Sequence, residues 1–159
     1  MPTAVPTDTA IIFYPGAKVE GTAYLPLLDQ LRQTGLTCIL VEMPFYLAIF
    51  DVNAAEDVMA QFPDIQHGYI AGHSMGGAMA SQFASEHPDE VDGLILLGAY
   101  LYGDYPPADT LTVYGSLNQS VEDKIDWVRI PEAYHLITTD KKYDCVMPFG
   151  QQAFIDKME

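Results

Sequence analysis

Basic residues are scarce in this chain of 159 residues, which has 7 Lys and Arg against 22 Asp and Glu and a formal net charge of −15. Nucleic-acid binding relies on clustered Lys and Arg that neutralise phosphates, so this balance argues against a nucleic-acid partner. Binding to an anionic membrane surface needs basic segments as well, and the sequence has none. The charge therefore excludes the classes of protein that bind polyanions.

Cysteine and long apolar runs are rare too. Cys38 and Cys145 make no disulfide framework, and neither a CxxC motif nor a zinc-type His/Cys spacing is present, so we expect no metal. The apolar runs fall short of the roughly 20 residues that span a bilayer. The first 15 residues lack the basic and apolar regions of a signal peptide. We therefore expect a cytoplasmic protein with no membrane partner, in which Cys38 is a small buried hydrophobe.

Hydrophobic residues make up 49% of the chain, which is enough for a core in one domain over residues 1–159. Short apolar runs alternate with helical patterns along its length. The predicted strands cover residues 10–14, 36–41, 68–71, 94–97, 111–114 and 125–130, and the predicted helices lie between them and at 149–158. In the first helix, Tyr24, Leu27, Leu28 and Leu31 fall at the spacing of one apolar face. This order predicts an α/β fold: a doubly wound, mostly parallel sheet of about six strands with helices on both faces. The last strand is the more polar one and suits a sheet edge.

The segment Gly72-His73-Ser74-Met75-Gly76 contains the G-x-S-x-G motif. It follows a predicted strand and precedes a helix, which is the setting of a nucleophile elbow that holds the serine in a strained conformation above the sheet. Gly72 and Gly76 are the positions where a side chain would clash with the neighbouring backbone. Ser74 is then the candidate nucleophile, and the N–H of Met75 at the helix N-terminus is a candidate oxyanion donor. The alternative is a glycine-rich turn with an incidental serine.

With this motif the chain resembles the α/β-hydrolase superfamily, and more closely the small bacterial esterase-like members related to dienelactone hydrolases. The likeness is strongest over residues 13–19, 41–44 and 72–94. It implies a minimal α/β-hydrolase fold without a cap domain. It also implies that the backbone N–H of Ala17, after the first strand, completes the oxyanion hole, and that Gly16 allows the close approach.

The general base implied by the resemblance is His135. The family order is serine, acid, then histidine, and His67 and His73 precede the serine. His87 lies about where the helix after the elbow ends. His135 alone has the right order. We expect it to act as the base, because a serine hydroxyl is a weak nucleophile without one nearby. The alternative for His135 is a histidine in a surface loop.

The acid is where the sequence departs from the family pattern. Asn118 occupies the position at which the family places an aspartate. An asparagine can hold an imidazole by hydrogen bonding but cannot stabilise its positive charge, and exchanging the acid for an amide in one serine protease lowers turnover about 10⁴-fold. Asp104, Glu122 or Asp123 could substitute, or the activity could be weak or absent. The alternative for each carboxylate is a solvated surface position.

Two aromatic segments follow predicted strands. They are residues 43–50, with Phe45 and Tyr46, and residues 100–107, with Tyr100. Because open α/β sheets bind ligands at the carboxyl ends of their strands, these three residues are candidates for substrate binding. Some of the apolar side chains in these segments could instead pack in the core.

Three hypotheses remain open at this point. The first is a serine hydrolase that acts on small carboxylic esters through an acyl-serine, without a cofactor. The second is a catalytically impaired binding protein with the same fold, which Asn118 and the shortened second half of the chain motivate. The third, a flavodoxin-like or dinucleotide-binding module, is disfavoured because no G-x-G-x-x-G or P-loop sequence opens the first helix.

Overall fold

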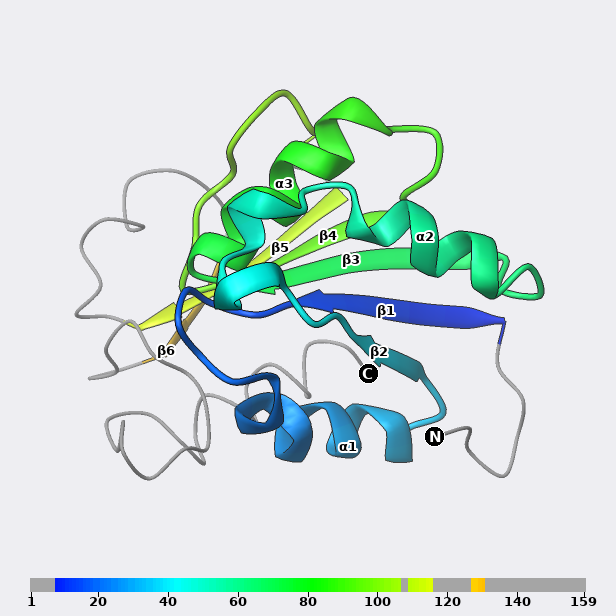
Figure 1. Cartoon of the computed structure of the whole chain (residues 1–159), viewed down its shortest axis with the longest axis horizontal. Helices are drawn as coiled ribbons and strands as arrows, with labels where there is room; N and C mark the ends of the chain where they lie inside the picture. Colours follow the sequence, from blue (N-terminus) through cyan, green and yellow to red (C-terminus); the bar gives the residue numbers. More distant parts are fainter. Residues whose placement is uncertain (1–7, 107–108, 116–126, 131–159) are drawn as a thin grey trace.

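A six-stranded sheet forms the centre of the computed structural model, which describes residues 8–106, 109–115 and 127–130 (Figure 1). The strands are β1 Thr9–Tyr14, β2 Thr37–Leu40, β3 His67–His73, β4 Gly93–Leu97, β5 Thr110–Gly115 and β6 Trp127–Ile130. They lie in the order β2-β1-β3-β4-β5-β6, and every neighbouring pair is parallel. The helices are α1 Leu25–Gln33, α2 Ala54–Gln61 and α3 Met75–Glu86, with short 3-10 turns η1 Gly21–Tyr24, η2 Pro44–Tyr46 and η3 Ala48–Phe50.

The strand order reverses between β1 and β3. The chain leaves β1 for the edge strand β2 and then returns past β1 to β3. As Figure 1 shows, α1 covers one face of the sheet, whereas α2 and α3 cover the other. The connections that leave β1 and β3 therefore diverge to opposite faces, and such a switch point is where open α/β sheets form a ligand-binding crevice.

The two faces of the sheet carry separate cores, because side chains alternate along each strand. Ile11 and Phe13 of β1 point to the α1 face, where α1 contributes three buried leucines, Leu27, Leu28 and Leu31. Ile12 and Tyr14 point to the opposite face. There the buried side chains come from β3, β4, α2 and α3, among them Ile70, Leu94, Leu96, Ala54, Ala55, Ala80, Phe83 and Ala84. The sheet is thus covered on both sides, as a continuous apolar strand such as β4 requires.

The N-terminus of α2 is capped by a residue distant in sequence. The sequence Asn53-Ala54-Ala55-Glu56 has the pattern of a capping box, but Asn53 makes no side-chain cap hydrogen bond. Instead, the hydroxyl of Tyr14 accepts a hydrogen bond from the N–H of Ala55 at 2.9 Å and donates one to the carbonyl of Val52 at 2.7 Å. The buried tyrosine on β1 satisfies the donor that a local side chain would otherwise satisfy.

The predicted α/β class and the parallel sheet are confirmed, and β6 is the last strand of the sheet among the described residues. Cys38 is half-buried rather than fully buried, and desolvation raises the pKa of its thiol to about 11. The helix predicted over residues 149–158 lies outside the described residues. Within the part of the chain that the structure describes, no helix is long and apolar enough to cross a membrane.

Candidate active site

The junction between β3 and α3 has the backbone of a nucleophile elbow. Ser74 lies there with φ 54° and ψ −121°, a region that non-glycine residues rarely adopt. The turn is tight enough that a Cβ at Gly72 would overlap the backbone of Gly76. A Cβ at Gly76 would overlap the carbonyl oxygens of Tyr14 and Pro15 at the end of β1. Glycine is therefore required at both positions, and the strain at Ser74 is imposed by packing on both sides of the turn.

Backbone hydrogen bonds hold Ser74 in this conformation. Its N–H donates to the carbonyl of Leu97 at the end of β4 at 3.0 Å, and its own carbonyl accepts from the N–H of Ala78 at 3.1 Å. Met75 is the first residue of α3, so its N–H has no acceptor within the helix. Both Ser74 and Met75 are half-buried. A half-buried hydroxyl thus lies beside an N–H at the positive end of a helix dipole.

The loop after β1, residues 15–18, lies against the elbow; we call it the β1 loop. A Cβ at Gly16 would lie 3.3 Å from the carbonyl oxygen of His73 and 2.7 Å from its Nδ1. The N–H of Val19 donates to the carbonyl of Gly16 at 3.2 Å, which closes a turn around Ala17. Among the described residues, the N–H of Ala17 has no hydrogen-bond acceptor. The loop therefore presents a backbone donor next to the elbow.

The outer side of the β1 loop is tied to η2. The N–H of Lys18 donates to the carbonyl of Tyr46 at 2.8 Å, and its Nζ donates to the carbonyl of Phe45 at 3.1 Å. All three residues have positive φ: 58° at Lys18, 54° at Phe45 and 59° at Tyr46. This left-handed backbone aims the two carbonyls at the loop while the aromatic rings point outward, with Phe45 76% and Tyr46 56% exposed.

A buried pair of polar side chains, Tyr24 and His73, contacts the β1 loop at Gly16. The N–H of Gly16 donates to the hydroxyl of Tyr24 at 2.9 Å, and the same hydroxyl lies 2.8 Å from Nδ1 of His73. Tyr24 is 1% exposed and His73 is 0% exposed. Sequence reasoning placed Tyr24 on the apolar side of a helix and set His73 aside. The signal that could have found the pair is a tyrosine where the pattern asks only for an apolar residue.

A cavity of about 320 Å³ opens beside the β1 loop. Its lining comes from the β1 loop and the residues up to η1, from the segment after β2 and from η2. It comprises Pro15, Val19, Gly21, Val41, Glu42, Met43, Phe45 and Tyr46. The structure thus brings two of the predicted substrate-binding residues, Phe45 and Tyr46, to the wall of a cavity. Phe45 also contacts Phe50 edge to face, with ring centroids 5.8 Å apart.

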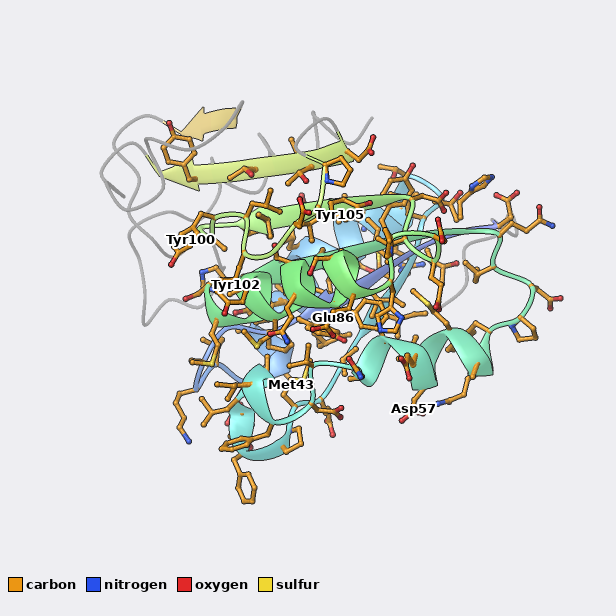
Figure 2. All side chains as sticks on the ribbon, turned by 90° about the horizontal axis from the view of Figure 1, so that it is seen from above. Met43, Asp57, Glu86, Tyr100, Tyr102 and Tyr105 are labelled. Carbon is orange, nitrogen blue, oxygen red and sulfur yellow. The ribbon has the colours of Figure 1, made fainter. Side chains whose placement is uncertain are left out.

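The third predicted substrate-binding residue, Tyr100, follows β4. Figure 2 shows Tyr100 and Tyr102 on the side of the molecule at which the strands end, whereas Asp57 on α2 lies on the other side. Tyr100 is 40% exposed and Tyr102 is 52% exposed. The backbone of Tyr102 exchanges two hydrogen bonds of 2.7 Å with the hydroxyl of Ser81, which holds this segment against α3.

The described histidines are unsuited to act as the base of Ser74. His67 begins β3, about 20 Å along the strand from the elbow at 3.3 Å per residue. His87 follows the C-terminus of α3, stacks on Phe83 and lies 3.2 Å from a carboxylate oxygen of Glu56 and one of Glu90. The ring of His73 is buried against Tyr24. The predicted base, His135, lies outside the described residues.

Of the four positions predicted for the acid, the structure describes only Asp104. Asn118, Glu122 and Asp123 lie outside the described residues. Asp104 is exposed, and its neighbour Gly103 packs so closely on Ser85 that a Cβ would lie 2.6 Å from the Ser85 hydroxyl. Ser85 is in the last turn of α3, about 15 Å along the helix from its first residue at 1.5 Å per residue. The structure therefore does not bring Asp104 to Ser74.

Comparison with known proteins identifies the family. The model of the α/β hydrolase family matches residues 10–151, which is most of the chain, so this chain belongs to that family. The parallel sheet and the strained serine between a strand and a helix agree with this membership.

Individual relatives are more distant. A pyrethroid hydrolase of Sphingobium wenxiniae is 29% identical, with 77% of this chain and 47% of that protein aligned. A protein of Mycobacterium phage D29 is 28% identical, with 61% of this chain and 38% of that protein aligned. The chain thus spans less than half the length of these two curated relatives. The crystal structure of a dienelactone hydrolase from Anabaena variabilis superposes with a TM-score of 0.68 at 20% identity, over 99% of this chain and 86% of that one.

Proposed function

We propose that the chain is a serine hydrolase that cleaves small carboxylic esters through an acyl-serine intermediate. The observation that carries this proposal is the conformation of Ser74, whose φ of 54° is held between glycines at the end of β3. Backbone strain of this kind persists only where the surrounding structure enforces it, and it clusters at active sites. Membership of the α/β hydrolase family supports the same conclusion.

In this mechanism the Ser74 hydroxyl attacks the ester carbonyl while His135 accepts its proton. The negative charge that develops on the carbonyl oxygen is stabilised by the N–H groups of Met75 and Ala17, which lie on α3 and on the adjoining β1 loop. His135 then returns the proton to the leaving alcohol, and an acyl-serine remains. Water, activated by the same histidine, adds to the acyl group and releases the acid. Each half of the reaction needs the oxyanion donors held in place in advance.

Asn118 occupies the position of the acid in this proposal. Its amide orients the imidazole of His135 by hydrogen bonding but adds no negative charge to stabilise the imidazolium, so turnover is slow. Glu122 and Asp123, a few residues further along the chain, are the carboxylates that could take over this role.

The size of the cavity beside the β1 loop favours a small substrate. Its volume of about 320 Å³ is near the lower end of the range for ligand pockets, roughly 300–1,000 Å³. The residues that line it are mostly apolar, with Glu42 as the one acidic residue, and the cavity adjoins the β1 loop without including Ser74, Met75 or Ala17 in its lining. A short acyl chain or a small alcohol group fits such a space.

The test uses a fluorophosphonate probe and a short-chain nitrophenyl ester with the wild type and Ser74→Ala. A matched control is Ser85→Ala, which removes a second serine hydroxyl from the same helix, one that donates locally to the carbonyl of Gln82. We expect labelling and turnover of the wild type and of Ser85→Ala, and a loss in Ser74→Ala on the order of 10³-fold or more. Folded wild-type protein that neither reacts with the probe nor hydrolyses the ester contradicts the proposal.

The competing function is an impaired hydrolase fold that only binds its ligand, and Asn118 is the observation that favours it. Asn118→Asp distinguishes the two. If the site is catalytic and lacks only an acid, this variant raises turnover, by up to about 10⁴-fold. The binding function is favoured if the folded wild type is neither labelled nor active and Asn118→Asp is also inactive.

A further inference from the structure

Two buried polar side chains join the β1 loop to the nucleophile elbow, and they belong to opposite sides of the switch point. Tyr24 is the last residue of η1, and His73 is the last residue of β3, directly before Ser74. The Tyr24 hydroxyl is within 2.9 Å of the Gly16 N–H and 2.8 Å of His73 Nδ1. One oxygen atom therefore contacts the residue before Ala17 and the residue before Ser74.

We propose that Tyr24 is a positioning residue that holds the Ala17 N–H at a fixed place relative to Ser74 by bonding Gly16 and His73 through its hydroxyl. The inference rests on the proposed function, because it assigns a role within the proposed oxyanion site. Tyr24 does not touch the substrate in this arrangement. It acts through the backbone of Gly16.

The direction of the first hydrogen bond follows from the groups involved. The Gly16 N–H can only donate, so the Tyr24 oxygen accepts that bond. The same oxygen and Nδ1 of His73 share a second hydrogen bond of 2.8 Å, whose direction depends on the imidazole tautomer. Desolvation raises the pKa of Tyr24 above its ordinary value, so the phenol keeps its proton at neutral pH.

Gly16 is packed tightly against the side chains of both Tyr24 and His73. A Cβ at Gly16 would lie 3.0 Å from the Tyr24 oxygen and 2.7 Å from His73 Nδ1. The Tyr24 ring is fixed in turn by Phe13 of β1, with ring centroids 4.7 Å apart. The phenol is therefore a rigid spacer between the sheet and the β1 loop, and its loss leaves the buried Gly16 N–H without an acceptor.

The chain contains a matched control in Tyr14. Its side chain is also fully buried, and its hydroxyl also accepts from a backbone N–H and forms a hydrogen bond with a second group. The groups it joins, Ala55 and Val52, are at the N-terminus of α2 rather than in the β1 loop. Tyr14→Phe and Tyr24→Phe therefore remove the same atom from two equally buried sites, and only one of these sites adjoins the proposed oxyanion donor.

The experiment measures kcat and KM for a short-chain nitrophenyl ester, inhibition by a trifluoromethyl ketone and urea unfolding, in the wild type and both variants. Removing one oxyanion donor outright costs about 10²–10³-fold in kcat, so a displaced donor should cost less. We expect Tyr24→Phe to lower kcat about 10- to 100-fold, to weaken the ketone to a similar extent and to change KM less than about threefold. We expect Tyr14→Phe to keep kcat within about twofold.

Equal effects of the two substitutions on kcat, or an unchanged kcat in Tyr24→Phe, overturn the inference. If Tyr24→Phe does not fold, Gly16→Ala tests the same contact and should show the same loss of kcat at nearly constant KM. An unchanged kcat in Gly16→Ala then overturns it. Labelling of wild-type Ser74 by the fluorophosphonate is measured in parallel. Its absence refutes the proposed function, whereas its presence with an unaffected Tyr24→Phe refutes only the role of Tyr24.

Discussion

The two faces of the sheet are packed by helices of different composition. On one face α1 contributes Leu27, Leu28 and Leu31, all buried. On the other face α3 contributes mainly small residues, Gly76, Gly77, Ala80, Ser81 and Ala84, together with Phe83. A helix with leucines stands off the sheet by the length of its side chains, whereas a helix with glycine and alanine brings its backbone against the strands. The small residues therefore accompany the helix that starts at Ser74.

This difference indicates where the fold tolerates change. The α1 face is an ordinary core, in which the contacts are between flexible side chains. At the start of α3 the contacts are between backbone atoms, because a Cβ at Gly76 would meet carbonyl oxygens of β1 and of the β1 loop. Side chains can repack when the space changes, but backbone held in a sheet cannot.

The largest effect is expected for Gly76→Ala. The added methyl group overlaps the carbonyl oxygens of Tyr14 and Pro15, so β1 and α3 must separate. We expect a loss of about 4 kcal/mol or more in the free energy of unfolding, or no folded protein. Gly35→Ala, after α1, is the control: its φ is 107° but no atom lies within 4 Å of the new Cβ, so only about 1–2 kcal/mol is lost. Urea unfolding measures both, and similar losses would contradict the comparison.

A smaller effect is expected for Leu31→Ala on the α1 face. Leu31 is 1% exposed, and removing a buried leucine side chain costs about 2–5 kcal/mol. Because Leu31 lies in the second half of α1, away from η1 and the β1 loop, we expect the free energy of unfolding to fall by about 3 kcal/mol while kcat stays within about twofold. A variant that stays folded but loses ester hydrolysis would show that this face also determines the geometry of the site.

The smallest effect concerns pH and Cys38, which lies on the edge strand β2 and packs against the α1-face core. Desolvation raises the pKa of its thiol to about 11. Below the ordinary thiol pKa both states are protonated and the full stability is present. Between about pH 9 and pH 11 only the unfolded chain ionises, so the stability falls, by no more than about 2 kcal/mol.

Urea unfolding of the wild type and Cys38→Ala between pH 8 and pH 11 measures this effect. Tyr14 and Tyr24 also have raised pKa values, caused by burial, and destabilise both proteins alike above pH 10. The difference between the two curves therefore isolates Cys38. Curves that stay parallel over this range would mean that the thiol is as accessible in the folded state as in the unfolded state.

Much of the fold was predictable because its signals are local. The apolar runs of β1, β3 and β4 and the pattern of Tyr24, Leu27, Leu28 and Leu31 indicated strands and a helix directly, and all four residues of that pattern are buried. The capping box at Asn53 is not formed, and the first turn of α2 is capped instead by the hydroxyl of Tyr14 on β1, which accepts from the N–H of Ala55. A sequence pattern within one segment contains no information about a capping side chain that is 41 residues away in the chain.

In the candidate site, too, the features set by local sequence were predictable and those set by distant residues were not. G-x-S-x-G after a strand predicted the position of Ser74, and the two glycines of the motif meet backbone in the structure as expected. The support of the β1 loop by Tyr24 and His73 is marked in the sequence only by a tyrosine within an apolar helical pattern. The left-handed carbonyls of Phe45 and Tyr46 that bind Lys18 left no pattern. These contacts join residues 8 to 49 positions apart.

The sequence by itself determined which residues form strands and helices and where a serine must sit on a strained turn, because hydrophobic periodicity and the steric demands of glycine act over a few neighbouring residues. Only the tertiary structure decided what surrounds that turn. The order β2-β1-β3 places the ends of two non-consecutive strands side by side, and the polar groups buried there had to find partners from distant parts of the chain.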